Sequence, residues 1–243
     1  MDKLSWQQHW NTTYGLNKDP NRELLLFPFL LKISKPIKNK SIADLGCGNG
    51  SLIVKLLRYK PKRIYGIDFS EVFLKFAKDH ITDKHVIFIK ADVRKQLPLS
   101  SNSFDIVYCT FVFNETNNLN SILKEISRIL KKNGRFYLMT THPFFSMNYY
   151  LYEKFTGKKN DKILNVKDYF KNFKGEYNLT MAKRTTPFYH HRFEELINVI
   201  IKNRLSVKYV KELSTNTKLL KSVPEYVELK DIPRVVLISA QKL

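Results

Sequence analysis

One stretch of the sequence combines an acidic residue with three closely spaced glycines. The apolar run Ser41–Leu45 predicts a buried strand, and the segment Asp44–Gly50 (DLGCGNG) continues from it. Glycine allows sharp turns with positive φ and leaves room for a ligand close to the backbone. Because a helix is expected directly afterwards, its unpaired amide groups are available to an acceptor group. The segment therefore predicts a ligand-binding turn between a strand and a helix.

A second acidic residue, Asp68, follows the next apolar run, Arg63–Ile67. A carboxylate at the end of the second strand can accept hydrogen bonds from both hydroxyls of a ribose. The dinucleotide fingerprint of dehydrogenases is Gly-x-Gly-x-x-Gly, but here the third glycine comes one residue earlier. Asp44 would also repel a pyrophosphate, whereas it would attract an ammonium or sulfonium group. The pattern favours a cationic nucleoside ligand over NAD.

The segment Ala43–Gly50 resembles the signature loop of class I S-adenosylmethionine-dependent methyltransferases, and the resemblance extends over roughly residues 40–141. It implies S-adenosylmethionine as cofactor, Asp68 as the ribose-binding acid and Asp92 as the acid that caps the adenine amino group. It also implies that the end of the fourth strand, at Cys109, lines the methionine moiety. The predicted cofactor-binding residues are Asp44, Gly46, Cys47, Gly48, Gly50, Asp68, Phe69, Asp92, Val93 and Cys109, with Trp10 and Tyr14 from an N-terminal segment that resembles a helical cap.

Each of these residues also has a purely structural interpretation. Asp44 and Asp92 could cap local backbone amides, Asp68 could be a turn residue, and Phe69 could belong to the core. Four such residues at the ends of successive strands are nevertheless typical of a ligand site.

The elements that must position these residues alternate between strand and helix. Strands are expected at 41–45, 63–67, 85–90, 104–110, 134–141, 205–213 and 234–241, and helices at 50–58, after Ser70, from a cap at Asn118 to Lys132, and at 192–204. This pattern predicts a Rossmann-like α/β fold with a seven-stranded, mostly parallel sheet, helices on both faces and an antiparallel strand near the C-terminus.

The chain divides into two expected parts. Residues 1–39 are predicted to form an N-terminal helical cap, and residues 40–243 a methyltransferase domain. Within that domain, residues 142–191 break the alternation and are expected to be an insertion on the acceptor side. The insertion contains an aromatic cluster that lines an acceptor pocket or gives the insertion its own core, made of Tyr149, Tyr150, Tyr152 and Phe155.

The acceptor side offers three candidate catalytic residues, His142, His190 and His191. Methyl transfer needs an aligned nucleophile and, for some acceptors, a group that removes a proton. The alternative is that these histidines are hydrogen-bonded residues that hold the insertion in place. The dipeptide Asn114–Glu115 is expected near the reacting methyl group, where it contacts an amine or only starts the next loop. The sequence shows no metal-ligand constellation, and the two cysteines are expected to be buried thiols.

The net charge of +20 is unusual and attracts polyanions, which makes RNA a candidate partner. The 42 basic residues comprise 32 Lys and 10 Arg, however, whereas phosphate and base recognition favours the bidentate Arg side chain. Such lysine usage also fits an AT-rich genome. A small-molecule or peptide-derived acceptor, methylated at O or N, is therefore the first hypothesis, and an RNA methyltransferase the second. The third hypothesis belongs to a different functional class: a non-catalytic protein that binds the cofactor and acts as a structural partner.

The sequence also bears on location. No apolar run approaches the ~18 residues that would span a bilayer, and the first twenty residues lack a secretory signal pattern. A cytoplasmic protein without membrane insertion is expected. The pattern predicts no particular oligomeric state.

Overall fold

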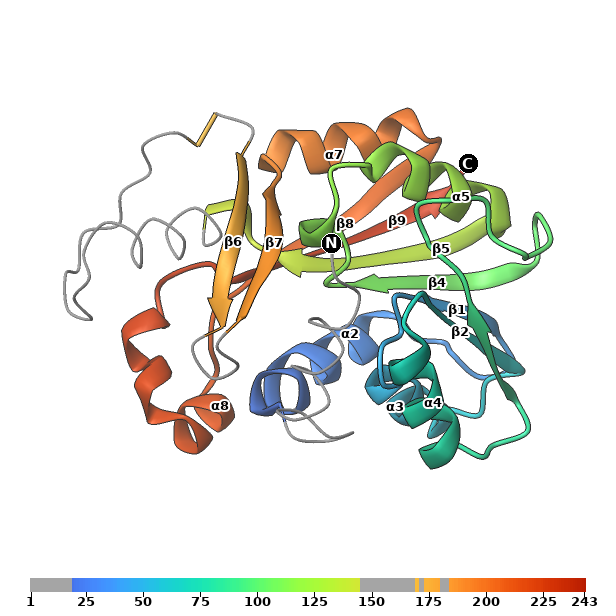
Figure 1. The fold of residues 1–243 in the computed structure, drawn as a ribbon, viewed down its shortest axis with the longest axis horizontal. Helices are drawn as coiled ribbons and strands as arrows, with labels where there is room; N and C mark the ends of the chain where they lie inside the picture. The colour runs from blue at the N-terminus through green and yellow to red at the C-terminus, as the bar shows by residue number, and fades with distance from the viewer. Residues whose placement is uncertain (1–18, 145–168, 171–172, 180–183) are drawn as a thin grey trace.

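A seven-stranded sheet organises the molecule (Figure 1). The computed structural model describes residues 19–144, 169–170, 173–179 and 184–243. The strand order is β3-β2-β1-β4-β5-β9-β8, with parallel pairing from β3 to β5 and antiparallel pairing of β9 with both β5 and β8. The strands are β1 (Ser41–Leu45), β2 (Arg63–Asp68), β3 (Val86–Lys90), β4 (Phe104–Thr110), β5 (Leu130–Thr141), β8 (Leu205–Leu213) and β9 (Val235–Lys242). The predicted mostly parallel, Rossmann-like sheet is confirmed.

Helices cover both faces of this sheet, as predicted (Figure 1). One face packs against α5 and α7, and the other against α2, α3 and α4. The helices and helical turns are η1 (Arg22–Leu26), α2 (Phe27–Ile33), α3 (Ser51–Leu57), α4 (Glu71–His80), η2 (Phe113–Glu115), α5 (Leu119–Ile129), α7 (Phe193–Lys202), α8 (Thr217–Ser222) and η3 (Pro224–Leu229). Both core layers draw on β4, because its successive side chains point to opposite faces.

Two helices begin at the capping residues that the sequence predicts. The Ser70 Oγ accepts a hydrogen bond from the Phe73 amide at 3.2 Å, and the Asn118 Oδ1 accepts one from the Ser121 amide at 3.4 Å. Each cap satisfies one of the amides that a helix start leaves unpaired, which stabilises the helix by about 1 kcal/mol.

The end of α5 differs from the expectation. The sequence predicts a helix that runs to Lys132, but α5 ends at Ile129 and β5 begins at Leu130. Leu130 is fully buried and pairs with Phe104 before the register shifts along β4. Burial of Leu130 within the sheet, beside β4, therefore outweighs the helical preference of the lysines that follow.

The expected insertion contains a separate two-stranded sheet. Strand β6 (Phe173–Leu179) pairs antiparallel with β7 (Arg184–His190). The aromatic cluster Tyr149, Tyr150, Tyr152 and Phe155 lies outside the described residues, as do Trp10 and Tyr14. The division into an N-terminal cap and a larger domain stays a prediction, for which residues 19–39 supply η1 and α2.

The helical turns α8 and η3, between β8 and β9, were not expected from the sequence. Helix α8 has six residues, of which only Leu219 is buried, so it carries little periodic signal. Within the described ranges, none of the helices reaches the length and apolarity that a bilayer-spanning segment needs.

Candidate functional site

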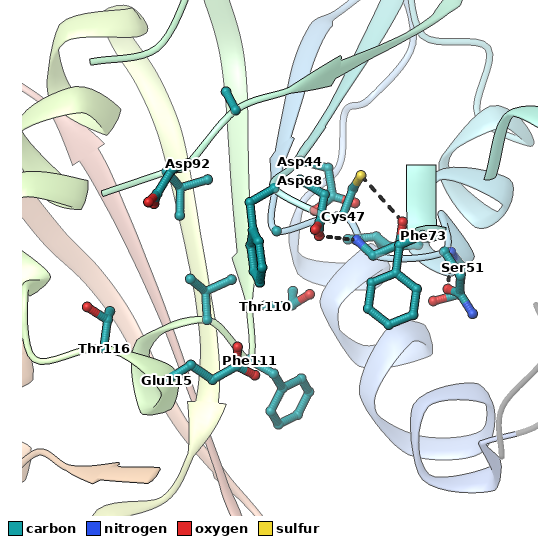
Figure 2. A pocket seen from close by; sticks show the side chains of 18 of the residues that line it. Asp44, Cys47, Ser51, Asp68, Phe73, Asp92, Thr110, Phe111, Glu115 and Thr116 are labelled. Atoms are coloured by element: carbon teal, nitrogen blue, oxygen red, sulfur yellow. Dashed lines mark hydrogen bonds between the residues drawn. The ribbon is translucent and has the colours of Figure 1, made fainter. Parts of the chain in front are cut away.

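A cavity of about 510 Å³ opens at the carboxyl ends of β1, β2 and β4. The order of the sheet reverses here, since β1 lies between β2 and β4 while the chain passes first to β2. Ligands of open α/β sheets bind at such a point. Figure 2 shows Asp44, Cys47 and Asp68 on one side of the cavity and Thr110, Phe111 and Glu115 along another.

The turn after β1 is shaped by its three glycines, all with positive φ. A Cβ at Gly46 would overlap the Val112 side chain, and one at Gly50 would lie 2.5 Å from the Ile81 Cδ1. A Cβ at Gly48 would meet nothing within 4 Å. Packing therefore requires glycine at Gly46 and Gly50, whereas the space beside Gly48 belongs to the cavity.

Asp68 joins the glycine turn to the end of β2. Its Oδ2 accepts a hydrogen bond from the Gly48 amide at 2.8 Å, and its Oδ1 accepts one from the Ser70 amide at 2.9 Å. Burial raises the pKa of Asp68, and these amide hydrogen bonds oppose the rise. Each carboxylate oxygen has a second lone pair, and Asp68 lines the cavity. It can therefore accept further hydrogen bonds from a bound ligand.

Asp44 is the most deeply buried acid of the site, at 1% exposure. Among the described residues its Oδ1 has no hydrogen-bond partner, although it lines the cavity. Burial first, and then the Asp68 carboxylate, raise the pKa of Asp44 to about 7, while Arg22 acts in the opposite direction. Buried polar atoms are normally paired, so an unpaired carboxylate oxygen facing a cavity fits a cationic ligand.

Asp92 lies after β3 and is held by Arg94. The guanidinium Nε and Nη2 of Arg94 donate to the two carboxylate oxygens at 2.8 and 2.7 Å. These hydrogen bonds hold the pKa of Asp92 below its usual range. The Arg94 backbone amide also donates to Oδ1, at 3.0 Å. Arg94 thus fixes the orientation of Asp92 at the wall of the cavity and leaves a lone pair free on Oδ2.

The cavity brings together most of the residues predicted to bind the cofactor. Those that line it are Asp44, Gly46, Cys47, Gly48, Asp68, Phe69, Asp92 and Val93. Of the predicted residues that the structure describes, two are not among the lining residues. Gly50 starts α3, and Cys109 is fully buried in the core under α5. The next residue, Thr110, lines the cavity instead, because successive side chains of a strand point to opposite faces.

Two of the three predicted catalytic histidines, His142 and His190, lie outside the cavity lining and hydrogen-bond to other protein groups. His142 Nδ1 accepts a hydrogen bond from the Phe144 amide at 3.1 Å, so its Nε2 donates to Glu212 Oε1 at 2.7 Å. The Nε2 of His190 lies 2.9 Å from the carbonyl oxygen of Tyr169. Burial lowers the pKa of both histidines. Neither is among the residues that line the cavity.

His191 supports the wall of the cavity from behind. Its Nε2 lies 3.0 Å from the carbonyl oxygen of Phe113 and 2.7 Å from that of Thr116. These two carbonyls bracket Glu115, which lines the cavity, whereas His191 does not. The geometry makes His191 a positioning residue for this loop, and the predicted catalytic role of all three histidines stays a prediction.

The structure adds lining residues to those predicted to bind the cofactor, among them Glu115, which was expected near the reacting methyl group. Arg22 of η1 places its guanidinium 5.3 Å from the centre of the Phe111 ring. Glu115 ends η2 and Thr116 follows it, and burial raises the pKa of Glu115 well above its usual range. The acid after the fourth strand was visible in the sequence, but no motif linked Arg22 to it across the chain. The described part of the chain has no cluster of His, Cys, Asp or Glu side chains that could hold a metal ion.

The two glycines Gly48 and Gly50 should respond differently to alanine. Gly50→Ala combines a left-handed backbone with a clash against Ile81 and is expected to lower the free energy of unfolding by about 2–4 kcal/mol. Gly48→Ala faces open space and should cost only the backbone strain, about 1–2 kcal/mol. Urea unfolding of both variants measures the difference, and equal losses would contradict the packing role of Gly50.

Replacing Asp44 by Asn should stabilise the ligand-free protein at high pH. Because folding raises the pKa of Asp44 to about 7, the folded state holds a proton that the unfolded chain has lost above about pH 4. Wild-type stability should therefore fall as the pH rises from about 4 to about 7, and Asp44→Asn should remove this part of the decline.

At pH 8 the Asn variant is expected to be about 1–3 kcal/mol more stable than wild type. Thermal unfolding of both proteins between about pH 5 and pH 8 tests this. A stability difference that does not change with pH would show that Asp44 is not the group that titrates.

The chain is similar to known methyltransferases in sequence and structure. Residues 43–138 match the family model described as a methyltransferase domain. An uncharacterized protein of Haemophilus influenzae is 25% identical over 232 residues, which cover 91% of this chain and 88% of that protein. A tRNA U34 carboxymethyltransferase of Helicobacter pylori (strain P12) is 31% identical over 115 residues, 46% of this chain and 44% of the relative. The chain thus matches less than half the length of the carboxymethyltransferase.

A solved structure shares the whole fold. The S-adenosylmethionine dependent methyltransferase from Mesorhizobium loti superposes with a TM-score of 0.76 at 22% identity, over 94% of this chain and 100% of that chain. The matched segment 43–138 contains the glycine turn, Asp68 and Asp92. With the strand order and the cavity described above, these similarities identify residues 43–138 as a methyltransferase domain and show that the chain has the fold of S-adenosylmethionine-dependent methyltransferases.

Proposed function

We propose that this methyltransferase transfers the methyl group of S-adenosylmethionine to an oxygen or nitrogen atom of a small molecule or peptide-derived metabolite that binds in the same cavity. The observation that carries the proposal is that strand β7 packs against η2, which supplies part of the wall of the cavity. His191 binds the backbone on both sides of Glu115. An acceptor that reaches Glu115 must therefore fit beside the loop that His191 holds in place.

The cavity fits the cofactor in shape and charge. The free space beside Gly48 allows a ligand to approach the backbone, and the unpaired Oδ1 of Asp44 offers a partner to a cation. We assign Asp68 to the ribose hydroxyls, Asp92 to the adenine amino group and Asp44 to the charged methionine end. Val93 and Phe69 line the same cavity and supply apolar surface for the base.

The bound cofactor supplies a methyl group that its sulfonium already activates. The protein must then hold the acceptor in line with that methyl group and exclude water. Thr110 and Phe111, at the end of β4, and Glu115 line the wall beside Asp44 and Asp68. These residues are the ones we expect to contact the acceptor.

RNA is the second candidate acceptor. The net charge of +20 favours a polyanion, and one similar protein is named as a tRNA-modifying enzyme. That similarity covers less than half of either chain, however, so it supports the shared chemistry more than a shared acceptor. The third hypothesis is a protein that binds the cofactor but catalyses no reaction. It would give no role to Glu115, the acid on the acceptor side of the cavity.

The class of the acceptor can be identified by finding which molecules receive the methyl group. The enzyme is incubated with S-adenosylmethionine carrying a deuterated methyl group and either protein- and RNA-free metabolites from a cell extract or purified total RNA. We expect mass spectrometry to find the label in metabolites. Label in the nucleosides of digested RNA would contradict the proposal and support the second candidate, and label in neither would support the third. Asp68→Ala is the control and should lose the transfer.

A further inference from the structure

Glu115 is an acidic side chain in the acceptor wall that no cofactor role explains. It is the last residue of η2, lines the cavity, and has no side-chain hydrogen bond or ion pair among the described residues. Figure 2 shows it on the wall of Thr110, Phe111 and Thr116, apart from Asp92. The bonds from His191 to the carbonyls of Phe113 and Thr116 hold the loop that carries it. The surrounding backbone therefore holds the Glu115 side chain in a position where it can contact a bound ligand.

The charges around the cavity indicate what kind of ligand it is. Three acids, Asp44, Asp68 and Glu115, line the cavity. The Asp68 carboxylate raises the pKa of both Asp44 and Glu115, and the Arg22 guanidinium lowers both. At the rim, Lys90 pairs with Glu71 at 2.5 Å, Arg94 pairs with Asp92, and Lys95 is exposed.

If the three interior acids are ionised, they exceed Arg22 by two negative charges. S-adenosylmethionine, with one sulfonium, one ammonium and one carboxylate, balances one of them. A negative charge is left on the acceptor side, and an unpaired buried charge is costly. An acceptor that carries one positive charge balances it.

We propose that Glu115 binds the methyl acceptor, that this acceptor is an amine which enters as an ammonium ion, and that the Glu115 carboxylate takes up the proton the amine must lose before it reacts. The inference rests on the proposed function, because it names the acceptor class and the base for that reaction. The unpaired Oδ1 of Asp44, at 1% exposure, is an independent sign that the same cavity receives cations.

The steps balance in atoms and charge. The ammonium nitrogen gives one proton to the Glu115 carboxylate and becomes a neutral amine with a free electron pair. That pair forms a bond to the methyl carbon while the carbon–sulfur bond breaks and its electrons return to sulfur. The products are a methylated ammonium ion, S-adenosylhomocysteine and a protonated Glu115, which then releases its proton to water.

The surroundings of Glu115 adapt it to this proton transfer. Burial first, and then Asp68, raise the pKa of Glu115 well above its usual range, and Arg22 opposes them. The buried Cys109 thiol and the His191 imidazole also face this loop. A carboxylate with a raised pKa accepts a proton from an amine less unfavourably than an exposed one.

The first test offers the enzyme two sets of acceptors. Metabolites from a protein- and RNA-free cell extract are separated into those that a cation-exchange resin retains at about pH 7, which are the amines, and those that flow through. The enzyme receives each set with deuterated-methyl S-adenosylmethionine. We expect label in the retained set. Label only in the flow-through would overturn this inference and leave the proposed function standing, whereas label in neither set would overturn both.

The second test separates proton transfer from structure. With the retained set, Glu115→Gln is expected to reduce methyl transfer about 100-fold at pH 7, and the deficit should shrink to about tenfold or less near pH 9.5, where solvent deprotonates the amine. Glu115→Asp should recover part of the activity at pH 7. Binding of S-adenosylmethionine, measured by calorimetry, should remain within about threefold of wild type.

The matched control is Asp79→Asn, which removes an exposed acid of α4 that pairs with Lys75 away from the cavity. It should leave both transfer and its pH dependence unchanged. A Glu115→Gln variant with wild-type transfer, or with a deficit that stays constant across pH while cofactor binding is intact, would overturn the role of Glu115 as base.

Discussion

Buried negative charge is the constraint on which the rest of this structure depends. Asp44 and Asp68 end two adjacent parallel strands, are almost fully buried, and both have raised pKa values. Amides of the glycine turn and of α4 stabilise Asp68, whereas the Oδ1 of Asp44 has no partner among the described residues. Packing alone would not favour this arrangement. It becomes favourable when a cation binds, so the site gives up stability for ligand binding.

The elements around the cavity keep these acids in place. The parallel strands set the spacing of Asp44 and Asp68, and the glycine turn is tied to β2 because the amides of Gly46 and Cys47 donate to the carbonyl oxygen of Ile67 at 2.8 and 3.0 Å. On the opposite wall, His191 anchors the loop of Glu115 from outside the cavity. Residues that the chemistry would use are thus held by backbone contacts rather than by one another.

The cofactor half was predictable from the sequence, because local signals specify it. Strands with apolar runs, caps at Ser70 and Asn118, and a glycine turn after an acid are all short-range patterns. On the acceptor side, Glu115 was expected near the reacting methyl group, but the effect of Arg22 on it was not predictable, because only the fold brings these distant parts of the chain to one cavity. Cys109 was assigned to the cavity from a family pattern, but the alternation of β4 turns it into the core and exposes Thr110 instead.

Calorimetric binding of S-adenosylmethionine to wild type and to Asp68→Ala, with Asp79→Asn as a surface control, tests whether this cavity holds the cofactor. We expect a dissociation constant on the order of 1–100 μM for wild type and the control. Binding should be weakened about 10- to 100-fold in Asp68→Ala, which loses the buried acceptor of the ribose hydroxyls. Equal affinity in wild type and Asp68→Ala, or no binding to wild type, would contradict the assignment of this cavity to the cofactor.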